Sequence, residues 1–252
     1  MSNQETFIRN IRTALGHAPD IRRDAPELFP QQPSAPSAEI IARIQRRTSG
    51  ERMELLARMT EAGNPINLDV TAVADEASAT TALLDLVRQR SPEWENQNQV
   101  CAWQHPLLEA LDLKTAFMAA DIPLYTVDTA RTEDRAAARK EIRRNNIASY
   151  IGITSADFAL ADTATLVMRA RPGQPRSMAI VPSIHLAVIQ LEQVLADLQE
   201  LYALLRWDEN EWQTGLSNYM SFTSGPSKTA DIEATMVHGA HGPREVHVFV
   251  IG

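Results

Sequence analysis

The chain has 252 residues, of which 44% are hydrophobic and 22% charged, and its formal net charge at pH 7 is −8. This size and composition predict one large globular domain, or one domain with an appendage, with a full hydrophobic core. The acidic balance argues against a nucleic-acid partner, because no excess of Lys and Arg is left to neutralise phosphates. The single cysteine, Cys101, excludes internal disulfides and any iron–sulfur cluster or zinc site made only of this chain's thiolates.

The sequence also shows no signal for membrane insertion or export. No apolar run reaches the roughly 20 residues of a bilayer-spanning helix, and the first residues, MSNQETFIRNIRTALG, lack the apolar centre of a signal peptide. We therefore expect a cytoplasmic protein with no membrane span.

The N-terminal region is predicted to be a helical arm. Residues 6–15 place Phe7, Ile8, Ile11 and Leu15 on one helical face. Five prolines follow between residues 19 and 36, and this density favours an extended tether. We expect residues 1–37 to form this helix and tether and residues 38–252 to form the main domain. The apolar stripe docks either on its own domain or on a partner chain.

The remaining pattern is typical of an α/β fold. Helices are expected over residues 37–62, with an interruption near Ser49, and over 80–90, 106–119, 132–145 and 191–205. Strands are expected over residues 100–103, 124–127, 147–154, 165–169, 177–181, 185–189 and 246–251, with a hairpin turn at 171–175. The last strand is apolar on both faces, as in a parallel sheet. Strands alternating with helices predict a mostly parallel open sheet with flanking helices.

A hydroxyl-rich loop near the C-terminus is the first candidate site. Its predicted ligand-binding residues are Ser224, Gly225, Ser227, Lys228 and Thr229. The loop lacks the two glycines of a Walker A motif, but a turn that opens a helix offers free N–H donors to an anion. Ser227 or Thr229 is predicted to cap a short helix from Ala230, so anion binding and self-capping are both open.

Acidic and histidine residues continue this segment. Asp231 and Glu233 are expected in the first helical turn and are candidate catalytic carboxylates. His241 is a predicted ligand contact, and His247 is expected to be a core histidine in the last strand. Two histidines three apart in a glycine-rich loop lack the fixed face of an HExxH helix, so no metal site is predicted.

A second polar cluster follows the predicted strand at 147–154. Asp162 is a candidate general base or hydrogen-bond acceptor, with a turn-forming acid as the alternative. Thr154, Thr163 and Thr165 are predicted ligand contacts, because ligands of open α/β sheets bind beyond the carboxyl ends of strands. Three further residues, Arg171, Arg176 and His185, either clamp a carboxylate or have structural or solvated roles. Cys101 is expected to be a buried, inert thiol.

Three segments together resemble the lactate utilization protein C family, which is built on the LUD domain. They are GITSADFALADTATLVM, the SIHLAV stretch, and SGPSKTADIE followed by VHGAHGPREVHVFVI. The resemblance spans roughly residues 100 to 252, and the motifs occur in the same order as in the family. This chain has Ala164 where the family usually has glycine, and Ala240 where it more often has valine. A methyl group at position 164 narrows any close backbone approach and puts an identical ligand in doubt.

The resemblance implies a fold like that of the ribose-phosphate isomerase and CoA-transferase superfamily. It also implies a non-redox subunit of a bacterial iron–sulfur system that oxidises L-lactate to pyruvate. The iron–sulfur clusters are then expected on partner proteins, and no cofactor is expected on this chain alone. The alternative is a stand-alone enzyme or binding protein for a small anionic ligand, either a sugar phosphate or an acyl-CoA.

Overall fold

The computed structural model describes residues 3–17, 32–127, 135–214, 219–230 and 236–252. The chain divides into two compact units, Met1–Ala38 and Glu39–Gly252. The first unit contains helix α1 (Asn3–Ala14), which has no buried residue. Its apolar residues Phe7 and Leu15 are 62% and 66% exposed. The predicted amphipathic helix is therefore present, and its apolar stripe is open to solvent within its own unit.

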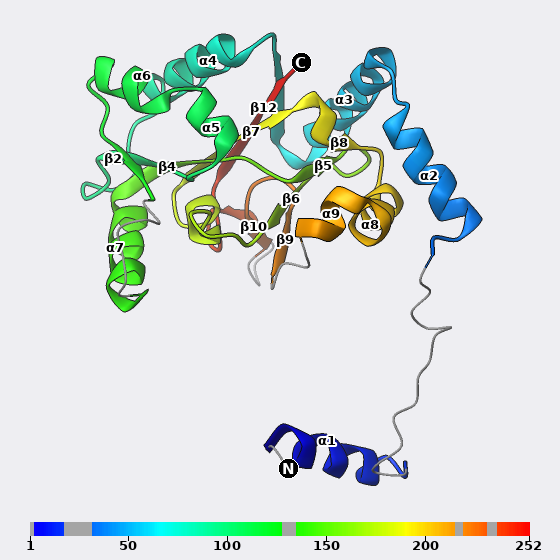
Figure 1. Ribbon diagram of the computed structural model, residues 1–252. Coiled ribbons are helices and arrows are strands. Elements are labelled where there is room, and N and C mark those ends of the chain that lie inside the picture. The colour runs from blue at the N-terminus through cyan, green and yellow to red at the C-terminus, as the bar shows by residue number, and fades with distance from the viewer. Residues whose placement is uncertain (1–2, 18–31, 128–134, 215–218, 231–235) are drawn as a thin grey trace. The chain divides into compact units, whose positions relative to one another are not determined.

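A six-stranded sheet forms the centre of the second unit (Figure 1). Its order is β1 (Leu68–Val73), β12 (Glu245–Ile251), β7 (Ile184–Gln190), β4 (Ser149–Thr154), β2 (Gln99–Ala102) and β3 (Leu124–Thr126). All five pairings between these strands are parallel. The predicted α/β class with a mostly parallel sheet is confirmed.

Helices cover both faces of this sheet. Figure 1 shows α4 (Glu76–Arg88), α5 (Pro106–Ala110) and α6 (Leu113–Ala119) on one side and α7 (Arg135–Ala148) on the other. This division follows from right-handed crossovers, because the chain moves toward β3 through α4 to α6 and returns to β4 through α7. Before β1, the chain forms α2 (Ala35–Gln45) and α3 (Ser49–Gly63), and Thr48 and Glu51 form a capping box at the start of α3.

A second, four-stranded sheet is inserted around β7. Its order is β8 (Val194–Leu195), β5 (Phe158–Leu160), β6 (Thr165–Arg169) and β9 (Met220–Thr223). Helix α8 (Leu198–Trp207) contributes Leu201 and Leu204 to a separate small core with leucines of this sheet. The short helix α9 (Glu209–Thr214) follows α8, and the two-stranded hairpin β10 (Lys228–Ala230) and β11 (Met236–His238) precedes β12.

The C-terminal strand β12 is central to the main core. It lies between β1 and β7, and its residues from Val246 to Ile251 are all buried. Both faces are covered because the sheet is parallel and has helices on each side. The predicted doubly buried strand is confirmed. No helix among the described residues is long and apolar enough to cross a membrane.

Three predicted helices differ from the structure. The helix expected over 106–119 breaks in two, because Asp112 adopts a left-handed conformation with φ 46°. The helix expected from residue 191 begins only at Leu198, after Asp197 accepts a hydrogen bond from the Glu200 backbone N–H as N-cap. The helix start expected at Ala230 is wrong, because Lys228–Ala230 pairs with Met236–His238 as a strand, and the next residues of that predicted helix lie outside the described ones.

Two strand predictions also need correction. The strand expected over 177–181 is wrong: Arg176–Ala179 is a 3-10 turn, whose Met178 packs on β4 at Gly152. An ideal Cβ at Gly152 would lie only 1.9 Å from the Met178 carbonyl oxygen. The expected strands also omit β1, an edge strand in which only Leu68 is buried, and the short strands β5, β8, β9, β10 and β11.

Candidate functional site

The topology of the main sheet marks one edge as the place for a ligand. The connection after β2 leads outward to β3, whereas the connection after β4 leads the opposite way to β7. This reversal makes the carboxyl ends of β2 and β4 a topological switch point, where open α/β sheets bind their ligands. The residues that follow these two strands are therefore the natural candidates for function.

A tight turn brings one arginine to this edge. Arg171, Pro172, Gly173 and Gln174 form a turn in which the Gln174 N–H donates to the Arg171 carbonyl at 3.1 Å. Gly173 has φ 79°, so the proline and glycine occupy the two central positions that a type II turn requires. The Gln104 N–H, just after β2, donates to the Gly173 carbonyl at 3.0 Å. The turn is thus fixed against the end of β2, with Arg171 at its start.

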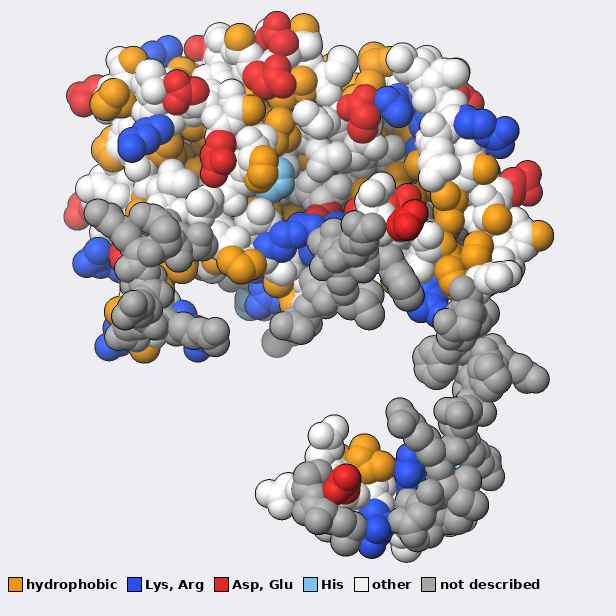
Figure 2. Space-filling model, in the orientation of Figure 1, with side chains coloured by type: hydrophobic (Ala, Val, Ile, Leu, Met, Phe, Trp, Pro, Cys, Tyr) orange, Lys and Arg blue, Asp and Glu red, His pale blue; other side chains and the backbone are white. Residues whose placement is uncertain are grey.

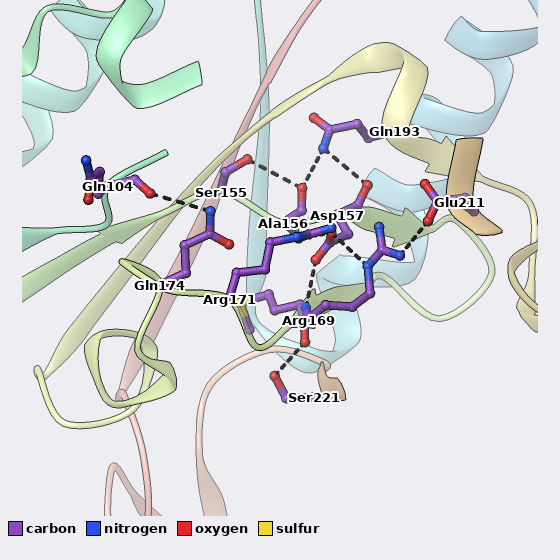
Figure 3. Close-up of polar contacts among 11 residues, drawn as sticks. Gln104, Ser155, Ala156, Asp157, Arg169, Arg171, Gln174, Gln193, Glu211 and Ser221 are labelled. Atoms are coloured by element: carbon purple, nitrogen blue, oxygen red, sulfur yellow. Dashed lines mark hydrogen bonds and ion pairs between the residues drawn. The ribbon is translucent and has the colours of Figure 1, made fainter. Parts of the chain in front are cut away.

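Asp157 lies at the centre of a buried charged cluster (Figure 3). It follows β4, and its side chain is only 6% exposed. Its Oδ2 accepts the Arg169 backbone N–H at 2.7 Å, and its Oδ1 accepts Arg169 Nε at 3.0 Å and also Arg171 Nη1. Arg169 also donates to Glu211 of α9. The charges of two arginines and two carboxylates are balanced within this cluster.

The state of Arg169 is set by its surroundings. Burial alone would lower the pKa of Arg169, but hydrogen bonds and charge from Glu211 and Asp157 raise it above its ordinary value. Its guanidinium also lies 5.6 Å from the centroid of the Phe158 ring. Arg169 therefore stays charged, its Nε and Nη1 are bonded to Asp157 and Glu211, and its side chain is only 7% exposed. It is a structural support for Asp157.

His105 lies within electrostatic reach of both Asp157 and Arg171. It is the N-cap of α5, and its Nδ1 accepts the Leu107 N–H at 3.2 Å. Burial, followed by a smaller effect from Arg171, lowers the pKa of His105, although Asp157 and Glu109 oppose this. The ring is therefore neutral at pH 7, and because Nδ1 is an acceptor, its proton is on Nε2.

This arrangement suits the recognition of an anion. Arg171 is 31% exposed, and Asp157 uses only its Nη1. Figure 2 shows a hollow near the middle of the visible face, with histidine, basic and acidic side chains around it. Sequence reasoning proposed Arg171 as a carboxylate clamp, but it did not single out His105. The sequence signal that could have indicated His105 is the His105-Pro106 pair shortly after the buried strand β2.

Four of the predicted site residues come together elsewhere, beside β6. Thr165 Oγ1 lies 2.6 Å from Ser224 Oγ and donates to Thr163 Oγ1 at 2.8 Å. Thr163 in turn donates to the exposed Asp162 carboxylate at 3.2 Å. Ala164 is buried between these threonines in the left-handed region, with φ 47°, a conformation that favours glycine. The hydroxyl groups satisfy one another here, and their binding role stays a prediction.

The predicted loop residues that follow lie at the β10–β11 hairpin. Lys228 Nζ donates to the Ile66 carbonyl at 2.8 Å, and Ser227 Oγ accepts the His241 N–H at 3.2 Å. Gly225 has φ 74°, and an added Cβ would lie 3.0 Å from the Ile66 oxygen. Thr229 pairs with Val237 across the hairpin. These contacts give the loop a structural function, and anion binding there stays a prediction.

Thr154, also a predicted ligand contact, is fully buried at the end of β4. Its Oγ1 lies 2.8 Å from His185 Nε2. Burial, together with the nearby His247, lowers the pKa of His185 to about 4, so His185 is neutral in the folded protein. His247 lies in β12 with Nδ1 3.1 Å from Asp69 and Nε2 3.3 Å from Glu245.

The remaining candidates are quickly placed. Asp231 and Glu233 lie outside the described residues. Within the described ranges, no group of three or more His, Cys, Asp or Glu side chains is placed to hold a metal ion. Cys101 is buried in β2, and burial raises its pKa to about 12, so its thiol stays protonated.

A pocket of about 500 Å³ lies at the carboxyl ends of β2 and β3, and its lining includes Gln104, which bonds to the Gly173 carbonyl. Its apolar wall includes Leu108 and Leu113, and its charged lining residues are Glu109, Asp112 and Lys114. Two carboxylates against one ammonium make this pocket a poor place for a phosphate or another highly charged anion.

Comparison with known proteins places this fold in a family. The LUD domain family model matches residues 56–251, so the chain belongs to the LUD domain family. Lactate utilization protein C of Halalkalibacterium halodurans is 25% identical over 243 residues, which cover 96% of this chain and 95% of that protein. The protein of the same name from an Exiguobacterium species is 26% identical over an aligned region that covers 100% of this chain and 96% of that protein. The resemblance inferred from the sequence is confirmed.

A solved structure supports the architecture. The crystal structure of a DUF162 family protein from Deinococcus radiodurans matches with a TM-score of 0.50 and 16% identity. The match covers 80% of this chain and 98% of that one. At this identity the likeness shows the fold alone.

Proposed function

We propose that this protein takes part in lactate utilization, as a non-redox component of a bacterial iron–sulfur system that oxidises L-lactate to pyruvate. The observation that carries the proposal is the full-length similarity to proteins named lactate utilization protein C, at 24–26% identity over 96–100% of this chain. A match over the whole length relates the complete α/β domain and the N-terminal region to those proteins.

The cysteine chemistry supports a role without a cluster on this chain. The protein has one cysteine, and a cluster held by thiolates alone needs several. Cys101 is buried, and its raised pKa keeps it protonated, so it is a poor ligand even for a shared site. In this proposal, the iron–sulfur clusters of the system belong to partner proteins.

The N-terminal helix supplies a surface for such a partner. The apolar residues Phe7, Ile8 and Ile11 of α1, and Leu15 directly after it, are each at least 40% exposed. A helix with an unburied apolar stripe is suited to lie in a groove of another protein. In this proposal, α1 docks on a cluster-bearing partner.

Lactate-dependent dye reduction tests the proposal directly. The partner proteins are co-expressed with and without this chain, and the reduction of a dye by lactate is followed in each preparation. We expect activity that depends on this chain, together with co-purification of the chain and its partners. Dye reduction that is equally fast without the chain would refute the proposed role.

A variant with Phe7→Glu and Ile11→Glu tests the arm. Both positions are exposed within their own unit, so the main domain should fold unchanged. Co-purification should be lost while the thermal unfolding of the main domain stays the same. Unchanged co-purification would show that α1 is not the contact.

A further inference from the structure

Within the described part of the chain, two side chains at the switch point, Arg171 and His105, keep hydrogen-bond donors that no other residue uses. Among the residues that the structure describes, Asp157 is the only hydrogen-bonded partner of the Arg171 guanidinium, through Nη1. The Nε and Nη2 groups therefore remain, and these two N–H bonds point in parallel and match the spacing of a carboxylate. The second donor is His105 Nε2–H, because its Nδ1 is occupied by the Leu107 N–H.

We propose that Arg171 and His105 bind a small 2-hydroxy or 2-oxo monocarboxylic acid, such as lactate or pyruvate. This inference rests on the proposed function for its choice of acid. The free edge of Arg171 binds the carboxylate through two hydrogen bonds. His105 Nε2–H donates to the oxygen on the neighbouring carbon, which is a hydroxyl in lactate and a ketone in pyruvate. Both oxygens accept a hydrogen bond, so the site holds the substrate or the product.

The surrounding contacts hold both donors in place. Asp157 holds one end of the Arg171 guanidinium, and the Arg171–Gln174 turn is fixed to Gln104 by the 3.0 Å bond to Gly173. His105 is held by its cap bond to α5. Donors that are already ordered lose little conformational entropy when a ligand binds.

The local charge favours a singly charged ligand. Arg169 and Arg171 are balanced by Asp157 and Glu211, so the cluster carries no surplus positive charge. A monocarboxylate brings one negative charge into this neutral cluster, whereas a phosphate dianion brings two, so the repulsion from Asp157 and Glu211 is larger for phosphate. The site should therefore prefer lactate and pyruvate to inorganic phosphate.

Isothermal titration calorimetry of the full-length chain tests the proposal with lactate, pyruvate, propionate and inorganic phosphate. Propionate has the carboxylate but lacks the oxygen on the neighbouring carbon. We expect lactate and pyruvate to bind more tightly than propionate, and all three to bind more tightly than phosphate. Equal or tighter binding of phosphate would overturn the assignment to a carboxylic acid, and so would no binding of lactate or pyruvate.

Three variants separate the two roles. Arg171→Lys keeps a positive charge near Asp157 but removes the parallel donors, and it should weaken lactate binding about tenfold or more. His105→Asn keeps a side chain that caps helices well and removes the Nε2 donor, so it should weaken lactate several-fold but leave propionate within about twofold. The matched control is Arg88→Lys, an exposed arginine at the end of α4 that lies 3.8 Å from Asp85, and it should bind as the wild type does.

Each outcome decides between the two proposals. If Arg171→Lys binds lactate as the wild type does while remaining folded by thermal unfolding, the site is wrong. If the chain binds no lactate or pyruvate but is still required for dye reduction, the inference fails and the proposed function stands. If it binds them through Arg171 but is not required for dye reduction, the site stands and the proposed function fails.

Discussion

Replacing Asp157 by asparagine tests the charged cluster on which the candidate site is built. The carboxylate is 6% exposed and accepts hydrogen bonds from the Arg169 backbone, the Arg169 guanidinium and Arg171. Asparagine has nearly the same shape, but it removes the negative charge and turns one acceptor into a donor. The substitution therefore isolates the electrostatic contribution of this side chain.

The expected loss follows from the exposure of its partners. Removing one member of a buried ion pair typically costs about 3–5 kcal/mol of unfolding free energy. Here Glu211 still neutralises Arg169, and Arg171 is 31% exposed and can be rehydrated. We therefore expect Asp157→Asn to lower the unfolding free energy by about 2–3 kcal/mol, at or below the lower end of that range. For a chain of this size, this lowers Tm by roughly 5–10 °C.

Urea unfolding followed by tryptophan fluorescence measures this loss. Trp103 is a suitable reporter, because it is buried beside the site and its Nε1 donates to the Pro175 carbonyl at 2.9 Å. The matched control is Asp162→Asn, five residues further along, whose exposed carboxylate accepts, among the described residues, only the Thr163 hydroxyl. The control should change stability by less than about 0.5 kcal/mol. An Asp157→Asn protein as stable as the control would refute the reasoning.

Two further predictions concern His185 and Gly152. The pKa of His185 is about 4 in the folded protein and 6.5 as its ordinary value, so between these pH values the unfolded state binds the extra proton. The free energy of unfolding should therefore fall as pH drops from 6.5 to 4, by as much as about 3 kcal/mol. Urea unfolding of the wild type and of His185→Asn at each pH should show a shallower fall in the variant. Parallel pH profiles of the two proteins would contradict this prediction. Gly152→Ala should cost about 3 kcal/mol or prevent folding, because its Cβ would lie 1.9 Å from the Met178 oxygen, whereas Gly50→Ala, with its nearest atom at 4.0 Å, should be neutral or stabilising. Equal urea midpoints for the two glycine variants would show that the turn after Arg176 does not pack on β4.

Local signals predicted the centre of the fold correctly. The apolar run in β12 is continuous because both of its faces are buried, and such a run identifies a parallel strand from its own residues. The alternation of strands and helices after Gln99 likewise predicts the α/β class from local residues alone. By contrast, β1 is an edge strand in which Asp69 and Thr71 interrupt the apolar residues, and its position depends on pairing with β12 from the far end of the chain.

The errors near the C-terminus also have a non-local cause. Ser227 and Thr229 are good helix caps, and the following acidic residues suit a first helical turn. Residues Lys228–Ala230 nevertheless form β10, because they pair with β11 and because Lys228 bonds to the Ile66 carbonyl, which is 162 residues away in sequence. Neither interaction can be predicted from the neighbouring residues in the sequence.

The candidate site was visible only in part for similar reasons. The sequence indicates Arg171 as a possible carboxylate clamp, but it does not show that Arg171 meets Asp157. Their meeting depends on the turn at Pro172 and Gly173 and on its contact with Gln104, which joins segments about 70 residues apart. His105 reads as an ordinary helix cap until the fold places it beside Asp157 and Arg171.

The central claim, that this protein is a required component of lactate oxidation without a redox centre of its own, is tested most directly by titrating the purified chain into its iron–sulfur partners. The rate of lactate-dependent dye reduction is measured at each ratio. We predict a rate that rises with added chain and levels off at a fixed ratio of chain to partners, while the chain alone reduces no dye. A rate that is the same at every ratio, including zero, would contradict the claim.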